Sequence, residues 1–213
     1  MIRAVLWDFG GVLTTSPFEA FQRFEQEHGY PVGFIRGINS HNPDDNAWAK
    51  LERNEVSIDE FDRLFDTEAR AAGRSLAGRQ VLSLLAGDLR PAMVRALERC
   101  AAHFKTACLT NNVAFGDGPG MARNSQAADR IAAVMALFDI VVESSAVGMR
   151  KPDPRFYEHA VAALGVGAEE CVYLDDLGIN LKPARELGMT TIKVVDPEDA
   201  LRELEKAIGI SLK

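Results

Sequence analysis

The chain is organised around one segment near its start, Arg3-Ala-Val-Leu-Trp-Asp8-Phe-Gly-Gly-Val-Leu-Thr14, which joins a short apolar run to an acid and two glycines. Residues 4–7 predict a strand buried on both faces, since strands of a parallel sheet read as continuous hydrophobic runs. Asp8 then stands at the carboxyl end of that strand, where ligands bind in open α/β sheets. The two glycines allow a sharp turn and a close approach to a ligand. Taken alone, Asp8 fits a turn-capping role at least as well as a chemical one.

Composition and charge narrow the class of protein. The chain has 213 residues, 47% of them hydrophobic, and 24 basic against 31 acidic side chains give a net charge of −7. This balance argues against a nucleic-acid partner, because phosphate backbones are bound mainly by Lys and Arg. No apolar run approaches the roughly 18 residues of a membrane span, and no signal-peptide core follows the first residue, so we expect a cytoplasmic protein. Cys100, Cys108 and Cys171 form no CxxC pair, which favours buried reduced thiols over disulfides or a zinc site.

The remaining sequence divides into a helical block and an alternating one. Residues 16–88 show helical periodicity, a capping box at Ser57 with Glu60, and a turn-rich loop at 39–46. From residue 91 onward, helices alternate with strands expected at 106–110, 139–143, 171–176 and 190–195, and a polar loop is expected at 111–124. Such alternation predicts a parallel sheet with helices on both faces. We therefore expect an α/β, Rossmann-like core of residues 1–15 and 89–213, with a small helical cap, residues 16–88, inserted after the first strand.

Polar residues that could support chemistry stand at four strand ends or just beyond them. The carboxyl ends of parallel strands share one edge of the sheet, so these side chains can converge. Crowded carboxylates raise one another's pKa unless a cation joins them, and oxygen ligands suit Mg²⁺. Lys, Thr and Asn supply donors for an anionic group such as a phosphoryl group. The residues are Asp8, Thr110, Asn111, Lys151, Asp175 and Asp176.

Four short motifs resemble, in order, those of the haloacid dehalogenase-like (HAD) hydrolase superfamily. They are Asp8-Phe-Gly-Gly-Val-Leu-Thr14, Leu109-Thr110-Asn111, Lys151-Pro-Asp153 and Tyr173-Leu-Asp175-Asp176. The sequence is most similar to the branch that includes the N-terminal phosphatase domain of mammalian soluble epoxide hydrolase and the similar domain of an acyl-CoA dehydrogenase family member. The resemblance covers the whole chain, is strongest after Asp139 and is weakest in the helical block.

The resemblance implies a phosphatase acting on a small phosphomonoester. Asp8 would be the nucleophile that forms an aspartyl-phosphate. Asp8, the Gly10 carbonyl and Asp176 would hold Mg²⁺, with Asp175 acting through water or orienting Lys151. Lys151 would neutralise charge on the nucleophile and the transferring group, and Thr110 with the Asn111 region would bind the phosphoryl oxygens. The helical block would be the cap that excludes water and selects the substrate.

One position departs from the family pattern. The family places a second Asp, the general acid and base, two residues after the nucleophile, and here that position is Gly10. Such acid–base help is typically worth about 10²–10⁴ in rate. A phosphatase without it should prefer aryl or acyl phosphates over alkyl esters, unless a cap residue such as His41 substitutes for the acid. Two alternatives stay open: a non-catalytic module that binds a phosphate ligand, and a metal-independent 2-haloacid dehalogenase. The sequence does not distinguish a monomer from a dimer.

Overall fold

The computed structural model describes residues 1–113, 122 and 124–212. Its centre is a parallel sheet in the order β3-β2-β1-β4-β5, so the first strand lies in the middle. Its register pairs Trp7 of β1 with Cys108 of β2 on one side and with Leu174 of β4 on the other. The carboxyl ends of these three strands therefore lie together. The strands are β1 (Ala4–Trp7), β2 (Lys105–Thr110), β3 (Ile140–Glu143), β4 (Cys171–Asp175) and β5 (Thr190–Lys193).

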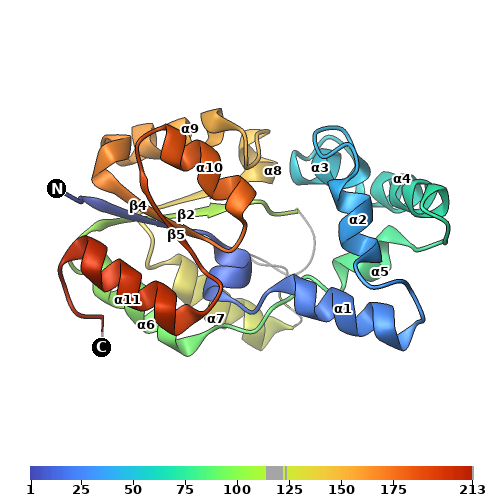
Figure 1. Ribbon diagram of the computed structural model, residues 1–213, viewed down its shortest axis with the longest axis horizontal. Helices are drawn as coiled ribbons and strands as arrows, with labels where there is room; N and C mark the ends of the chain where they lie inside the picture. Colours follow the sequence, from blue (N-terminus) through green and yellow to red (C-terminus); the bar gives the residue numbers. More distant parts are fainter. Residues whose placement is uncertain (114–121, 123, 213) are drawn as a thin grey trace.

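Helices cover both faces of the sheet, which confirms the expected α/β, Rossmann-like architecture (Figure 1). One face packs against α6 (Pro91–Ala101), α7 (Ser125–Met135) and α11 (Pro197–Ile208), and the other against α9 (Pro154–Leu164) and α10 (Gly178–Glu186). Alternate residues of β1 serve the two layers: Val5 and Trp7 face the first, and Ala4 and Leu6 face the second. Two further short elements of this region are α8 (Ser144–Val147) and η3 (Ala168–Glu170).

Five helices form a separate cluster after the first strand. Phe61 and Phe65 of α4 are fully buried in it, and Trp48 packs edge-on against both rings. The chain enters and leaves this block side by side, because Thr14 bridges Leu89 and the Thr15 amide donates to the Asp88 carbonyl at 2.9 Å. The helices are α1 (Pro17–Glu27), α2 (Phe34–Ser40), α3 (Ala47–Glu52), α4 (Ile58–Ala71) and α5 (Gly78–Leu82).

The structure corrects several sequence-based boundaries. The strands expected at 106–110 and 139–143 begin at Lys105 and Ile140. The loop expected at 39–46 begins later, because Asn39 and Ser40 belong to α2, a helix that the pattern did not predict. The strand expected at 171–176 ends at Asp175. The strand expected at 190–195 ends at Lys193, since the Val195 amide turns back to the Lys193 carbonyl at 3.2 Å. Residues 114–121 and 123 of the loop expected at 111–124 lie outside the described residues.

The three cysteines are buried and free, as the sequence predicts. Burial raises the pKa of the Cys100 and Cys171 thiols to about 12, so both are protonated at neutral pH. Each packs in one of the two core layers. Among the described residues, no helix combines the length and the apolar character needed to cross a lipid bilayer.

Candidate active site

Three side chains from distant parts of the sequence meet at the carboxyl edge of the sheet. Asp8 follows β1, Asp175 is the last residue of β4, and Lys151 lies between α8 and α9. The Lys151 Nζ is 2.8 Å from Asp8 Oδ1 and 2.8 Å from Asp175 Oδ2. All three side chains are almost fully buried. The convergence that the sequence predicts for these residues is therefore present.

The turn after β1 places Asp8 and makes room for Asp176. The Asp8 amide donates to the Leu174 carbonyl of β4 at 2.8 Å, and Asp8 Oδ1 accepts from the Phe9 amide at 2.7 Å. The chain then turns through η1 (Phe9–Leu13), where Gly11 has a φ of +82°. A Cβ on Gly11 would clash with Asp176 Oδ2. Gly11 is thus required both by its backbone conformation and by the close approach of the Asp176 carboxylate.

Lys151 is fixed at its backbone as well as at its ammonium group. The Asn111 side chain, just beyond β2, accepts from the Lys151 amide at 2.8 Å and donates to the Lys151 carbonyl at 3.0 Å. The Nζ of Lys151 also lies 3.1 Å from the Tyr173 hydroxyl. Both functional groups of the Asn111 side chain are therefore engaged in holding the backbone of Lys151.

Asp175 and Asp176 are neighbours with different environments. Asp175 is fully buried and accepts hydrogen bonds from the Leu177 amide, the Asn180 side chain and the Tyr173 hydroxyl, besides its contact with Lys151. Asp176 is half-buried, and its Oδ2 accepts from the Ser16 hydroxyl at 3.5 Å. Asp175 is thus surrounded by protein donors, whereas Asp176 faces the entry of the helical block.

Sequence reasoning assigned no role to two of these partners, Tyr173 and Asn180. Tyr173 carried a usable signal, because it stands two residues before Asp175 in a strand and therefore points to the same side of the sheet. Asn180 stands five residues after Asp175 in the first turn of α10, and only the path of the chain brings its amide back to the carboxylate.

The cluster contains three carboxyl groups and one ammonium group, so negative charge exceeds positive charge when all are ionised. Burial raises the pKa of Asp8 to about 8; Lys151 opposes this rise, and the carboxylates of Asp175 and Asp176 add to it. Burial and the Asp175 carboxylate raise the pKa of Asp176 to about 6. For Lys151, burial favours the neutral amine, but the carboxylates of Asp175 and Asp8 outweigh it and raise the pKa. One buried cation thus serves three carboxylates, and a further cation would keep Asp8 ionised at neutral pH.

The donor set fits a hard divalent cation. Asp8, Asp175 and Asp176 each offer a carboxylate oxygen, and these atoms lie within 4.8 Å of one another. Oxygen ligands of this kind suit Mg²⁺, which is usually bound by one or two carboxylates and keeps several waters. Since Asp175 is engaged by protein donors, Asp8 and Asp176 are the better placed direct ligands. Thr110 ends β2 beside this edge and is buried, with Asn111 directly after it.

The family of the chain follows from its sequence. Residues 2–188 match the haloacid dehalogenase-like hydrolases. The chain belongs to this family. It is 35% identical over 99% of its length to mouse acyl-CoA dehydrogenase family member 10, and 30% identical over 99% of its length to pig bifunctional epoxide hydrolase 2. The chain spans only 19% and 40% of these two proteins. A sesquiterpene phosphatase from Aspergillus oryzae is 27% identical, with 97% of each chain covered.

Solved structures agree with this HAD-like fold. A HAD-like family hydrolase from Porphyromonas gingivalis superimposes with a TM-score of 0.70 over 98% of both chains, at 22% sequence identity. A HAD family enzyme from Bacteroides thetaiotaomicron, solved in complex with magnesium and inorganic phosphate, gives a TM-score of 0.60 at 19% identity and covers 91% of this chain and 94% of its own. At these identities the likeness shows the shared fold.

The two glycines of the Asp8 turn give a matched pair of substitutions. Gly11→Ala should lower the free energy of unfolding by about 1–2 kcal/mol from its positive φ alone, and the added Cβ displaces Asp176. Gly10→Ala should be neutral or stabilise by up to about 1 kcal/mol, because Gly10 has a φ of −70° and a Cβ there meets nothing within 4 Å. Urea unfolding measures both. Equal effects at the two positions would contradict this view of the turn.

Proposed function

We propose that this HAD-like hydrolase is a Mg²⁺-dependent phosphomonoester phosphatase that acts through an aspartyl-phosphate on Asp8. The observation that carries the proposal is the buried arrangement of Asp8, Lys151 and the adjacent acids at one sheet edge. The proposal is supported by a sesquiterpene phosphatase among the relatives of the chain and by the magnesium and phosphate bound by a protein of the same fold. The small phosphomonoester substrate is part of the same proposal.

Each residue of the cluster has a defined part in the proposed reaction. Asp8 Oδ1 is held by Lys151 and the Phe9 amide, which leaves the other carboxylate oxygen to attack phosphorus. The bond to the leaving oxygen then breaks, and water hydrolyses the acyl phosphate to release phosphate and restore Asp8. Lys151 neutralises negative charge on the nucleophile and the transferring group. The Thr110 hydroxyl and the backbone around Asn111 bind phosphoryl oxygens.

The metal site is proposed at the same edge. Asp8, the Gly10 carbonyl and Asp176 would hold Mg²⁺, and Asp175 would act by orienting Lys151, to which it is joined at 2.8 Å. The ion would supply positive charge to the phosphoryl oxygens. The chain itself contributes the oxygen donors and the buried setting in which this charge acts strongly.

The helical block, residues 16–88, is proposed as a cap over the site, with residues 1–15 and 89–213 as the core. Two observations support the division. Apart from Val113, the buried residues packed around Phe61 and Phe65 all come from the block, and Ser16, directly before α1, contacts the Asp176 carboxylate. A cap in this position would exclude water and select the leaving group.

A second candidate function, a non-catalytic module that binds a phosphate ligand, is favoured by Gly10. Without a carboxyl group at this position, the site lacks the proton donor that the family pattern supplies. His41, the cap residue considered as a substitute for this acid, is exposed at the end of α2, and its backbone carbonyl accepts a hydrogen bond from the Asn46 side chain. A metal-independent 2-haloacid dehalogenase fits less well, because the acid cluster suits a cation.

Turnover of p-nitrophenyl phosphate tests the proposal directly. We expect Mg²⁺-dependent release of p-nitrophenol, reduced by about 10³-fold or more in Asp8→Asn because the nucleophile is removed. Asp196→Asn is the matched control, since Asp196 only caps α11 and Asn caps a helix equally well. Turnover unchanged by Asp8→Asn would refute the mechanism. Binding of phosphate without turnover would favour the binding module, and halide release from a 2-haloacid would favour the dehalogenase.

The missing acid predicts a strong dependence on the leaving group. The wild-type protein should hydrolyse aryl and acyl phosphates well and simple alkyl phosphates poorly, because an alkoxide leaves badly without a proton. Gly10→Asp should raise turnover of an alkyl phosphate by about 10²-fold, since it restores the acid of the family pattern at a position where a Cβ meets nothing within 4 Å. Gly10→Asn, which has nearly the same size but no acid, is the control. Similar wild-type rates for alkyl and aryl phosphates at neutral pH would contradict the prediction. His41→Ala would then test whether His41 substitutes for the missing acid.

A further inference from the structure

The residue before Lys151 reaches across to the helical block. Arg150 Nε lies 2.6 Å from Glu52 Oε2, and Arg150 Nη1 donates to the Pro43 carbonyl at 2.8 Å. Glu52 belongs to α3, and Pro43 lies in the loop that precedes it. A single side chain from the Lys151 segment is therefore bound to two points of the block, 98 and 107 positions earlier in the sequence.

This ion pair is largely removed from water. The side chains of Arg150 and Glu52 are only 19% and 9% exposed. Glu52 is also oriented from within the block, because its Oε1 accepts from the Trp48 indole at 2.9 Å. Exposed ion pairs contribute little to stability, but breaking a buried pair leaves an uncompensated charge. The contact between Arg150 and Glu52 thus strongly favours one placement of α3.

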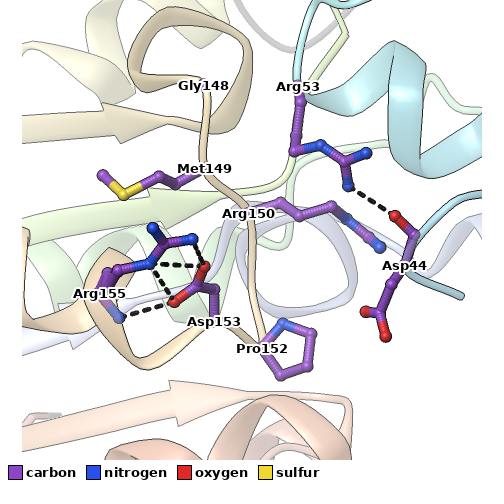
Figure 2. A pocket seen from close by; sticks show the side chains of 8 residues that line it. All are labelled: Asp44, Arg53, Gly148, Met149, Arg150, Pro152, Asp153 and Arg155. Atoms are coloured by element: carbon purple, nitrogen blue, oxygen red, sulfur yellow. Dashed lines mark hydrogen bonds and ion pairs between the residues drawn. The ribbon is translucent and has the colours of Figure 1, made fainter.

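The other arginines near this contact do not join the two parts. A cavity of about 430 Å³ lies between them, lined from the block by Asp44 and Arg53 and from the core by residues 148–150, 152, 153 and 155 (Figure 2). Arg53 pairs with Glu55 and the Asp44 carbonyl, both within the block. Arg155 pairs with Asp153, at the start of the same helix. Of the three arginines that line this cavity, Arg150 alone binds across it.

The core end of the contact is rigid. Lys151, the next residue, is held at its amide and its carbonyl by the Asn111 side chain, and its ammonium group is bound to Asp8 and Asp175. The Arg150 side chain therefore extends to the block from a fixed point directly beside the reacting groups. Movement of α3 away from that point would require the buried pair to separate.

We propose that Arg150 is a positioning residue that anchors α3 to the Lys151 segment and so sets the height of the helical block above Asp8. The inference rests on the proposed function, because it assigns the space under the block to the leaving group of the substrate. Arg150 acts through Glu52 and touches neither the phosphoryl group nor the nucleophile. Its effect falls on binding of the leaving group, while Lys151 keeps its own contacts for the chemical step.

The position of α3 can be measured without any activity. The protein has two tryptophans: Trp7 is fully buried in the core, and Trp48 is bonded to Glu52. Arg150→Met keeps the apolar stem, and Glu52→Gln keeps an acceptor for Trp48. Each should increase acrylamide quenching of tryptophan fluorescence, because Trp48 becomes more accessible. Arg155→Met is the matched control, since it removes an arginine from the same cavity but not from the contact with α3, and it should leave quenching unchanged. Circular dichroism confirms that each variant is folded.

Kinetics distinguish an anchor from a contribution to chemistry. In Arg150→Met and Glu52→Gln, KM for p-nitrophenyl phosphate should rise about tenfold with kcat changed less than about twofold, the pattern of lost ground-state binding. The double variant should lose no more than either single one, because both remove the same interaction. Arg150→Lys should be intermediate, since one ammonium group cannot reproduce the geometry of a guanidinium.

Three results would overturn the inference. They are unchanged quenching in both single variants, a fall in kcat at unchanged KM, and additive losses in the double variant. If the protein proves to have no phosphatase activity, the quenching experiment still decides whether Arg150 anchors the block, so failure of the proposed function and failure of this inference are separable.

Discussion

The site depends on the two ion pairs that the buried ammonium group of Lys151 makes with Asp8 and Asp175. Moving an unpaired cation out of water is very costly, so Lys151 can occupy the interior only with Asp8 and Asp175 beside it. The ends of β1 and β4 supply these carboxylates because the two strands are neighbours in register. Asn111, at the end of β2, fixes the backbone that delivers the lysine. The order of the strands in the sheet thus determines which carboxylates lie beside the buried Lys151 ammonium group.

The two adjacent acids, Asp175 and Asp176, differ in how their negative charge is compensated. Asp175 receives donors from Lys151, Tyr173, Asn180 and the Leu177 amide, so its charge is compensated inside the protein. The Asp176 side chain accepts from the Ser16 hydroxyl at 3.5 Å, and its raised pKa reflects burial and the neighbouring charge of Asp175. The first acid stabilises the folded cluster, and the second is left for an external cation.

Much of this arrangement could be predicted from sequence because it depends on strand ends. An apolar run that stops at an acid places Asp8, and Asp175 follows from the same rule in β4. The pairing of Asn111 with the Lys151 backbone and of Arg150 with Glu52 could not be predicted, since spacing does not say which distant side chains meet. Helix α2 was missed for a related reason: it has a central glycine, and its stability comes from burying Phe34, Ile35 and Ile38 rather than from a pattern of its own.

Gly10 and Gly11 are adjacent, yet they are glycines for different reasons. Gly11 is dictated by geometry, because of its positive φ and the Asp176 oxygen against it. At Gly10 the backbone is ordinary and the space is open, so the absence of a carboxyl group has no steric cause. A carboxyl group there would join three others around one lysine, in surroundings that already raise the pKa of Asp8 and Asp176. The same surroundings would favour its neutral, protonated form, and only its ionised form would repel the carboxylate of Asp8. Glycine at position 10 therefore keeps a fourth carboxyl group, and the negative charge it would carry when ionised, out of the cluster.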